Sequence, residues 1–141
     1  MTTRPPAELR RQVIERAGSA CEYCLLRQDF AASAHQVDHV ISEKHGGSTS
    51  LDNLALSCTT CNRRKGSDIG SFDPQTGALT PLFNPRTQTW SDHFTFDGLR
   101  IVGLTSEGRA TVELLTLNSP ERVVERSEMA RAGRFPPHYG P

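Results

Sequence analysis

The chain has 141 residues, which suits one domain of ordinary size. Its formal net charge is zero, which argues against a protein that coats nucleic acid through bulk positive charge. Hydrophobic residues make up 35% of the sequence and aromatic residues 6%, so the core should be modest and should benefit from a staple such as a disulfide or a metal. No apolar run is long enough to span a membrane, and the first residues lack the apolar stretch of a signal peptide. We therefore expect a cytoplasmic protein with no membrane partner, and the sequence indicates no oligomeric state.

Periodicity and turn residues predict the elements of the first half. Apolar residues at helical spacing predict a helix over residues 5–17, ended by Gly18. Strands are predicted over residues 36–41 and 52–56, with a loop over residues 44–50 between them. Thr59 or Thr60 is predicted to cap a helix that ends near Gly66.

The second half has a different character, because turn residues are frequent over residues 72–77. Strands are predicted over residues 94–96 and 99–102, joined by the turn Asp97-Gly98, and a further strand over residues 110–114. Ser119 and Pro120 are typical of the start of a helix. The fold class is therefore α+β. We expect residues 1–70 to form a core with an N-terminal helix, and residues 71–141 to form an α+β extension packed on that core within one domain.

Two identically spaced cysteine pairs frame the first half of the chain, Cys21 with Cys24 and Cys58 with Cys61. A C-x2-C turn places two thiolates within reach of one tetrahedral ion, and two such turns complete a four-thiolate shell. Two disulfides, or four unrelated buried thiols, are the alternatives, and a reducing compartment disfavours the disulfides. The spacing predicts a structural Zn²⁺ with no open coordination position, and hence no part in catalysis.

A second motif lies inside the cysteine frame. It consists of H-Q-V-D-H-V-I over residues 35–41, Gly46-Gly47, D-N-L over residues 52–54, and C-N-R-R-K-G over residues 61–66. This combination resembles the HNH endonuclease family. The resemblance covers about a third of the chain and implies a ββα-metal fold, held here by the two cysteine knuckles, together with metal-dependent hydrolysis of phosphodiester bonds in DNA.

The resemblance also implies a role for each residue of the motif. His39 would be the general base, since a histidine accepts a proton from water near neutral pH. Asp38 would be a metal ligand, and the side-chain amide of Asn53 would tie the loop across the hairpin and set the pose of His39. Asn62 stands where the family often has a second histidine. Because carboxylate and amide oxygens suit hard cations, Asp38 and Asn62 together predict a catalytic Mg²⁺ or Mn²⁺.

Each of these residues also has a plainer interpretation. Asp38 and His39 are neighbours on a predicted strand, so their side chains should leave opposite faces unless the chain bends there. They could be a surface pair, Asn53 a turn residue, and Asn62 a helix cap. The chain would then be a non-catalytic zinc module that binds nucleic acid or protein. The joint occurrence of all four residues in register favours the nuclease.

Three basic residues follow Asn62 on the predicted helix, namely Arg63, Arg64 and Lys65. A basic cluster is often only a solvated face. Beside a nuclease centre, however, such residues are expected to contact phosphates, which positions a duplex without reading its sequence. We therefore expect DNA, in its double-stranded form, to be the partner.

Overall fold

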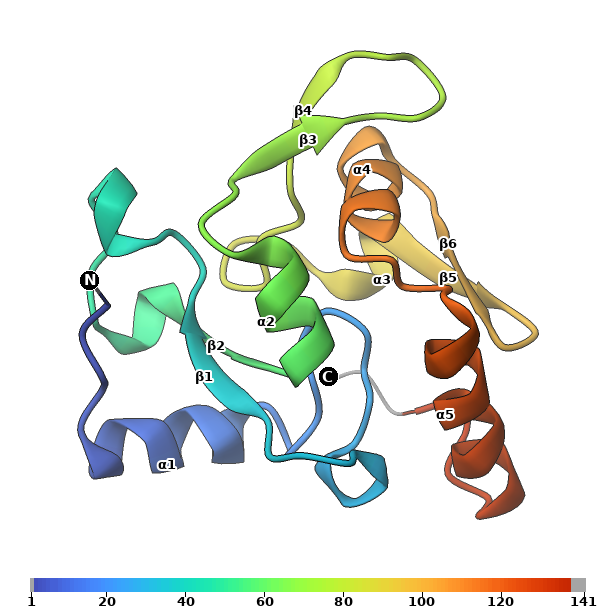
Figure 1. Cartoon of the computed structure of the whole chain (residues 1–141), viewed down its shortest axis with the longest axis horizontal. Coiled ribbons are helices and arrows are strands. Elements are labelled where there is room, and N and C mark those ends of the chain that lie inside the picture. The colour runs from blue at the N-terminus through green and yellow to red at the C-terminus, as the bar shows by residue number, and fades with distance from the viewer. Residues whose placement is uncertain (1, 138–141) are drawn as a thin grey trace.

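The structure is a computed structural model that describes residues 2–137, and Figure 1 shows the arrangement of its elements. In the first half, helix α1 (Ala7–Arg16) packs on the hairpin of β1 (Gln36–His39) and β2 (Leu54–Ser57). The strands are antiparallel, with Asp38 opposite Ala55 and His39 opposite Leu54. A small apolar cluster of Val13, Leu54 and Leu56 joins the helix to the hairpin.

Short 3-10 turns fill the connections of the first half. They are η1 (Gln28–Phe30), η2 (Glu43–His45) and η3 (Leu51–Asn53). The second predicted strand therefore begins two residues later than expected, because its first residues form η3. Helix α2 (Thr59–Lys65) follows β2 and lies near the centre of the molecule (Figure 1). Its N-cap is Cys58, whose sulfur accepts a hydrogen bond from the Cys61 amide, and neither threonine serves as the cap.

The second half consists of two more hairpins and three helices. Its elements are β3 (Gly70–Phe72), β4 (Leu79–Pro81), α3 (Trp90–His93), β5 (Phe94–Asp97), β6 (Arg100–Gly103), α4 (Ser106–Leu114) and α5 (Pro120–Arg131). The hairpin β5–β6 and helix α5 lie where the sequence predicted them. The hairpin β3–β4, whose turn includes the turn-rich residues Asp73 to Gly77, was not predicted. Mixed helices and small antiparallel hairpins make the fold α+β.

The prediction of a strand over residues 110–114 is wrong, because these residues end helix α4. Thr105 caps this helix by accepting a hydrogen bond from the Gly108 amide at 3.1 Å. Gly108 packs against the preceding strands so closely that a Cβ there would lie 2.1 Å from the carbonyl oxygen of His93. Ala110 and Thr111 are buried as well. Tertiary packing therefore outweighs the strand preference of β-branched residues.

The main core draws on both halves of the chain. All four cysteines belong to one buried cluster with aromatic and aliphatic residues of the second half, among them Phe83, Trp90, Phe94, Ile101 and Met129. The indole of Trp90 also donates a hydrogen bond to the Tyr23 carbonyl at 2.9 Å. Among the described residues, no helix is long and apolar enough to cross a membrane.

Candidate functional site

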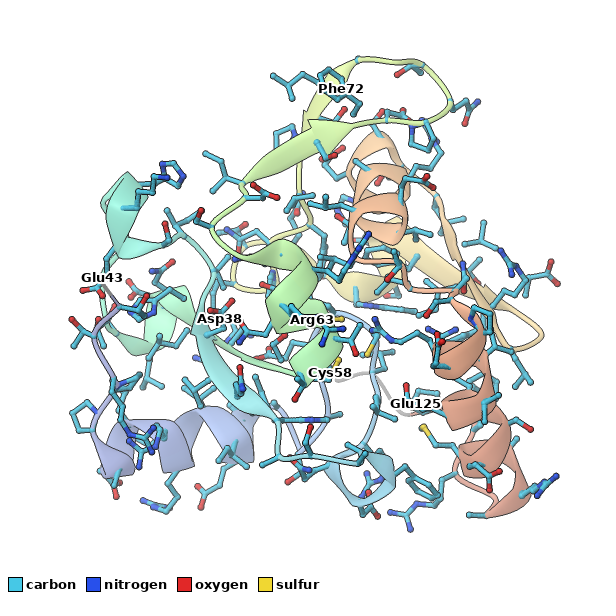
Figure 2. All side chains as sticks on the ribbon, viewed as in Figure 1. Asp38, Glu43, Cys58, Arg63, Phe72 and Glu125 are labelled. Atoms are coloured by element: carbon cyan, nitrogen blue, oxygen red, sulfur yellow. The ribbon has the colours of Figure 1, made fainter. Side chains whose placement is uncertain are left out.

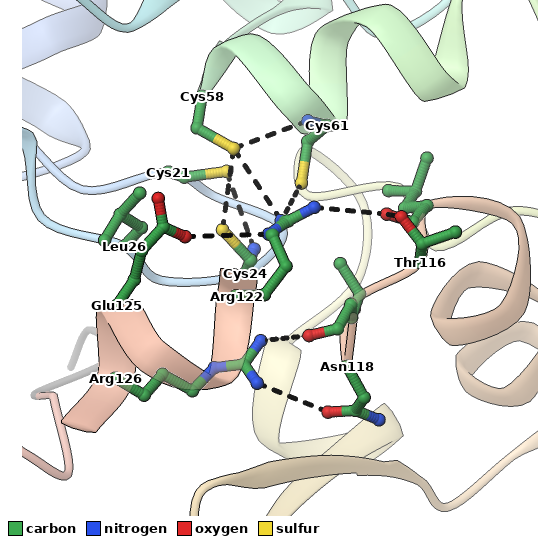
Figure 3. Close-up of polar contacts among 12 residues, drawn as sticks. Cys21, Cys24, Leu26, Cys58, Cys61, Thr116, Asn118, Arg122, Glu125 and Arg126 are labelled. Carbon is green, nitrogen blue, oxygen red and sulfur yellow. Dashed lines mark hydrogen bonds and ion pairs between the residues drawn. The ribbon is translucent and has the colours of Figure 1, made fainter. Parts of the chain in front are cut away.

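The four cysteines meet at one buried point between the two knuckles and helix α5 (Figure 3). Their sulfurs all lie within 4.8 Å of one another, and all four are free thiols. The sulfurs of Cys24 and Cys58 are 3.7 Å apart. In a tetrahedral zinc site, Zn–S bonds of about 2.3 Å separate neighbouring sulfurs by about 3.8 Å. The donor set and its spacing therefore fit zinc.

Local backbone geometry prepares each knuckle for this role. The Cys24 amide donates to the Cys21 sulfur at 3.5 Å, and the Cys61 amide donates to the Cys58 sulfur at 3.4 Å. Such N–H···S contacts favour thiolates over thiols. Burial raises the pKa of the Cys21 and Cys61 thiols, whereas hydrogen bonds from the other cysteines lower that of Cys24. Because zinc requires thiolates, its binding must release the protons that remain on the cluster.

A second site lies in a pocket of about 430 Å³ beside the hairpin β1–β2. Asp38, His39 and Asn62 all line this pocket, although the first two are neighbours on a strand. Strand β1 ends at His39, and the chain turns away before η2. Both residues therefore line one pocket at the end of the strand. The pocket also includes Ser42 and Glu43, which the sequence did not single out.

His39 is 3% exposed, and its two ring nitrogens differ in their surroundings. Nε2 lies 2.8 Å from the Thr49 hydroxyl. Nδ1 is buried and has no hydrogen-bond partner among the described residues. The Ser42 hydroxyl is likewise buried without a partner. Buried polar atoms are nearly always paired, so two unpaired ones beside the same pocket indicate a place for a water or a ligand.

Asp38 faces Asn62 on one side and Lys65 on the other. The terminal amide atom of Asn62 that faces Asp38 lies 3.1 and 3.3 Å from its two carboxylate oxygens. This atom is the amide nitrogen, which donates to both carboxylate oxygens, so the two side chains are hydrogen-bonded to each other. The Lys65 ammonium lies 3.5 Å from the carboxylate. Burial raises the pKa of Asp38, and the charge of Lys65 opposes that rise.

Asn53 connects the hairpin to the loop that carries Thr49. Its side-chain oxygen accepts from the Ile41 amide at 3.0 Å, and its side-chain nitrogen donates to the carbonyls of Ile41 and Ser48, both at 2.8 Å. Gly47 lies directly against these groups, because a Cβ there would be 1.7 Å from the Ile41 oxygen. The loop can close on Asn53 only with glycine at this position.

Comparison with known proteins identifies a family that resembles this part of the chain. The model of the HNH endonuclease family matches residues 21–68, which hold both knuckles together with Asp38, His39 and Asn62. The chain carries an HNH endonuclease domain. The chain is also 27% identical over 114 residues to Septu protein PtuB of Bacillus thuringiensis, a match that spans 79% of this chain and 42% of that protein. No solved structure matches the chain.

The basic residues of the HNH domain lie in three different surroundings. Arg63 is exposed and lines the pocket of Asp38, and Figure 2 shows both residues. Arg64 is exposed as well, and its Nε donates to the Leu114 carbonyl at 3.3 Å. Lys65 is only 2% exposed and donates to the His39 carbonyl at 3.1 Å. In contrast to the expectation from sequence, Lys65 does not offer its charge to a phosphate at the surface.

Two residues beside the HNH motifs were missed by sequence reasoning. Thr49 lies in a loop of small polar residues, and nothing in its spacing distinguishes it from Ser48 or Ser50. Arg122 lies far along the chain, yet its guanidinium contacts the Cys61 sulfur at 2.8 Å. No motif announces either residue, because only the fold brings each to its partner.

Proposed function

We propose that this chain is a metal-dependent endonuclease that hydrolyses phosphodiester bonds in DNA, with its centre at Asp38, His39 and Asn62. The HNH domain supports a nuclease-type function acting on nucleic acid. The observation that carries the finer proposal is the unpaired Nδ1 of His39, buried at the pocket that Asp38 and Asn62 also line. A nitrogen lone pair kept free in such a place is suited to take a proton from a water molecule.

His39 acts as the general base. When Nε2 carries the ring proton and donates to Thr49, Nδ1 is left with its lone pair. Nδ1 accepts a proton from water, whose oxygen forms the new bond to phosphorus while the bond from phosphorus to the 3′-oxygen breaks. Thr49 is a positioning residue, because its hydroxyl fixes the ring and favours this tautomer. Asn53 also positions His39, but indirectly, because its side chain holds the loop that carries Thr49.

Asp38 and Asn62 are the proposed ligands of a divalent ion. Both side chains carry an oxygen donor and line the same pocket, and such donors fit a hard ion such as Mg²⁺ or Mn²⁺. When bound, such an ion stabilises the negative charge that develops on the phosphate and on the departing oxygen. Lys65 keeps the partly buried carboxylate of Asp38 charged and ready to bind.

Arg63 and Arg64 are the proposed phosphate contacts on α2, with double-stranded DNA as the substrate. Arg63 lines the catalytic pocket, so a phosphate that it binds would lie close to His39. These contacts position the duplex and do not select a sequence.

The test is the nicking of supercoiled plasmid by the purified, zinc-loaded protein, with and without added Mg²⁺. We expect nicking that depends on Mg²⁺ and falls by about 10²–10⁴-fold in His39→Ala, because the general base is lost. The matched control is His45→Ala, which replaces an exposed histidine of the same loop region. Zinc content and circular dichroism should be unchanged in both variants. Undiminished nicking by folded His39→Ala, or no Mg²⁺-dependent nicking by wild type, would contradict the proposal.

A further inference from the structure

The zinc site has a neighbour that lies outside the HNH domain. Arg122, on helix α5, is 3% exposed, and its side chain reaches the cysteine cluster (Figure 3). Its Nη2 lies 2.8 Å from the Cys61 sulfur and 3.7 Å from the Cys58 sulfur. Its Nη1 donates to the Leu115 carbonyl at 3.2 Å. The guanidinium is thereby fixed between the metal cluster and the end of α4.

Charge explains why a cation belongs at this point. Four thiolates around Zn²⁺ carry a net charge of −2, and this charge lies inside the main core. A buried charge is costly unless it is paired and hydrogen-bonded. The same holds for a buried guanidinium, and the nearest carboxylate, that of Glu125, is 3.9 Å from Nε. Arg122 therefore balances part of the negative charge that Zn²⁺ leaves on the thiolates, and the thiolates are the nearest negative groups to its Nη2.

The neighbouring arginine shows that this is a specific arrangement. Arg126 is also buried on α5, but its Nη1 donates to the Leu99 carbonyl at 2.9 Å and to the Asn118 side chain at 3.3 Å. These hydrogen bonds, and a further one to the Leu117 carbonyl, go to oxygen atoms of the second half. Arg122 alone of these two reaches across to sulfur, over a sequence separation of 61 residues from Cys61.

We infer that Arg122 stabilises and protects the zinc centre through its contacts with the ligating sulfurs. Its N–H···S contacts neutralise part of the thiolate charge at Cys61 and Cys58, so they slow the loss of zinc and the attack of electrophiles on these sulfurs. They also couple metal loading to the docking of α5, which makes the extension beyond residue 70 part of the unit that zinc stabilises. This inference is independent of nuclease activity.

The experiment compares Arg122→Met with Arg131→Met in the full-length, zinc-loaded protein. Arg131 lies on the same helix with its side chain 77% exposed, so its replacement controls for the loss of a positive charge. Zinc release to excess chelator and alkylation of the cysteines are measured. A charge-assisted hydrogen bond lost from the thiolates should speed both reactions by about tenfold or more in Arg122→Met. Rates equal to those of wild type and of Arg131→Met would overturn the inference.

A second variant and a spectroscopic measurement cover the case in which Arg122→Met does not fold. Arg122→Lys keeps a cation but loses the planar fork that reaches sulfur and the Leu115 carbonyl together. Loaded with Co²⁺, the protein should show a shifted sulfur-to-metal charge-transfer band in Arg122→Lys, because this band responds to hydrogen bonds on the ligating sulfurs. Arg131→Met should show the wild-type band. An unshifted band and an unchanged metal-release rate in Arg122→Lys would overturn the inference.

Discussion

The cysteine cluster and the proposed catalytic pocket share helix α2 yet differ in almost every physical property. Cys61 and Asn62 are consecutive residues on this helix, about 100° apart around its axis, and each serves a different centre. The cluster is wholly buried, uses sulfur donors and has a cation at its edge. The pocket is open to solvent, uses oxygen and nitrogen, and keeps polar atoms unpaired.

The difference distinguishes a centre suited to maintaining the fold from one that we propose carries out chemistry. A closed thiolate shell leaves nothing for a substrate to bind, so its contribution is folding energy. The unpaired Nδ1 of His39 and hydroxyl of Ser42 beside the pocket indicate a place there for a water, an ion or a substrate. Mutations on the two faces of one short helix should therefore have opposite consequences for stability and for activity.

The largest effect is expected from breaking the cluster. Cys58→Ser removes one thiolate and also the sulfur that caps α2. Because zinc binding and folding are one process, on the order of 10 kcal/mol is at stake, and the variant should lose zinc and unfold or precipitate. Metal analysis and circular dichroism measure this, with Ser57→Ala as a neighbouring control. Folded, active protein without zinc would show that the cluster is not a structural metal site.

Replacing the neighbouring residue should spare the fold and affect the other metal. Asn62→Ala should raise the Mg²⁺ concentration for half-maximal nicking by about 10–100-fold, because one of two protein ligands is lost. Wild type should work with Mg²⁺ or Mn²⁺ and poorly with added Ni²⁺, whereas Asn62→His should shift the preference toward Ni²⁺ or Co²⁺. Nicking across a metal series measures both changes. If Asn62→Ala nicks DNA like wild type at limiting Mg²⁺, Asn62 is not a metal ligand and has only a structural place in the helix.

A smaller loss of activity is expected when His39 is kept but loses the hydrogen bond that orients its ring. Thr49→Val keeps the shape of the side chain but removes the hydroxyl at Nε2 of His39. We expect kcat to fall by about tenfold with KM nearly unchanged, since such supporting contacts typically contribute 10–100-fold. The ¹⁵N resonances of His39 should show mixed tautomers in the variant and one tautomer in wild type.

Thr49→Ser should restore both properties, because it returns the hydroxyl, and Ser48→Ala is a control in the same loop. If Thr49→Val keeps wild-type kcat and a single tautomer, Thr49 only fills space. A change of tautomer without a change of kcat would instead count against His39 as the base.

The smallest effect concerns the exposed arginines. Arg63→Ala removes one proposed phosphate contact and should reduce the slope of log affinity against log salt by about 0.9 for duplex DNA. A Ca²⁺-containing binding assay at several salt concentrations measures the slope without cleavage. Arg4→Ala, which replaces an exposed arginine of the N-terminal segment, is the control. Equal slopes for the two variants would place the DNA on another face.

How far the sequence predicts this molecule depends on whether the relevant contacts are local. Helix α1, the knuckles and the hairpin β5–β6 are encoded by short patterns, and the structure has them where expected. Helix α4 was mistaken for a strand, since its helical state depends on packing of Gly108 and Thr111 against residues distant in the sequence.

The site shows the same division. The clustering of the four cysteines was predicted from their spacing, and Asp38, His39 and Asn62 line one pocket. In contrast, the adjacent residues Arg64 and Lys65 look alike in sequence, but one is exposed and the other buried against Asp38. Arg122 looked like one basic residue among several scattered ones. No local pattern distinguishes a buried cation from a solvated one, because its partner comes from another element.

The long sequence separation between Arg122 and the cysteines also affects how the protein is made. Cys61 completes the set of zinc ligands 61 residues before Arg122 leaves the ribosome. At synthesis rates of about 5–20 residues per second, this interval lasts roughly 3–12 s. During that time a nascent chain that has already captured zinc holds its thiolates without their counter-charge. If Arg122 protects the thiolates as we infer, each new molecule should pass through a brief stage in which its cysteine cluster is most exposed to oxidants and competing metals.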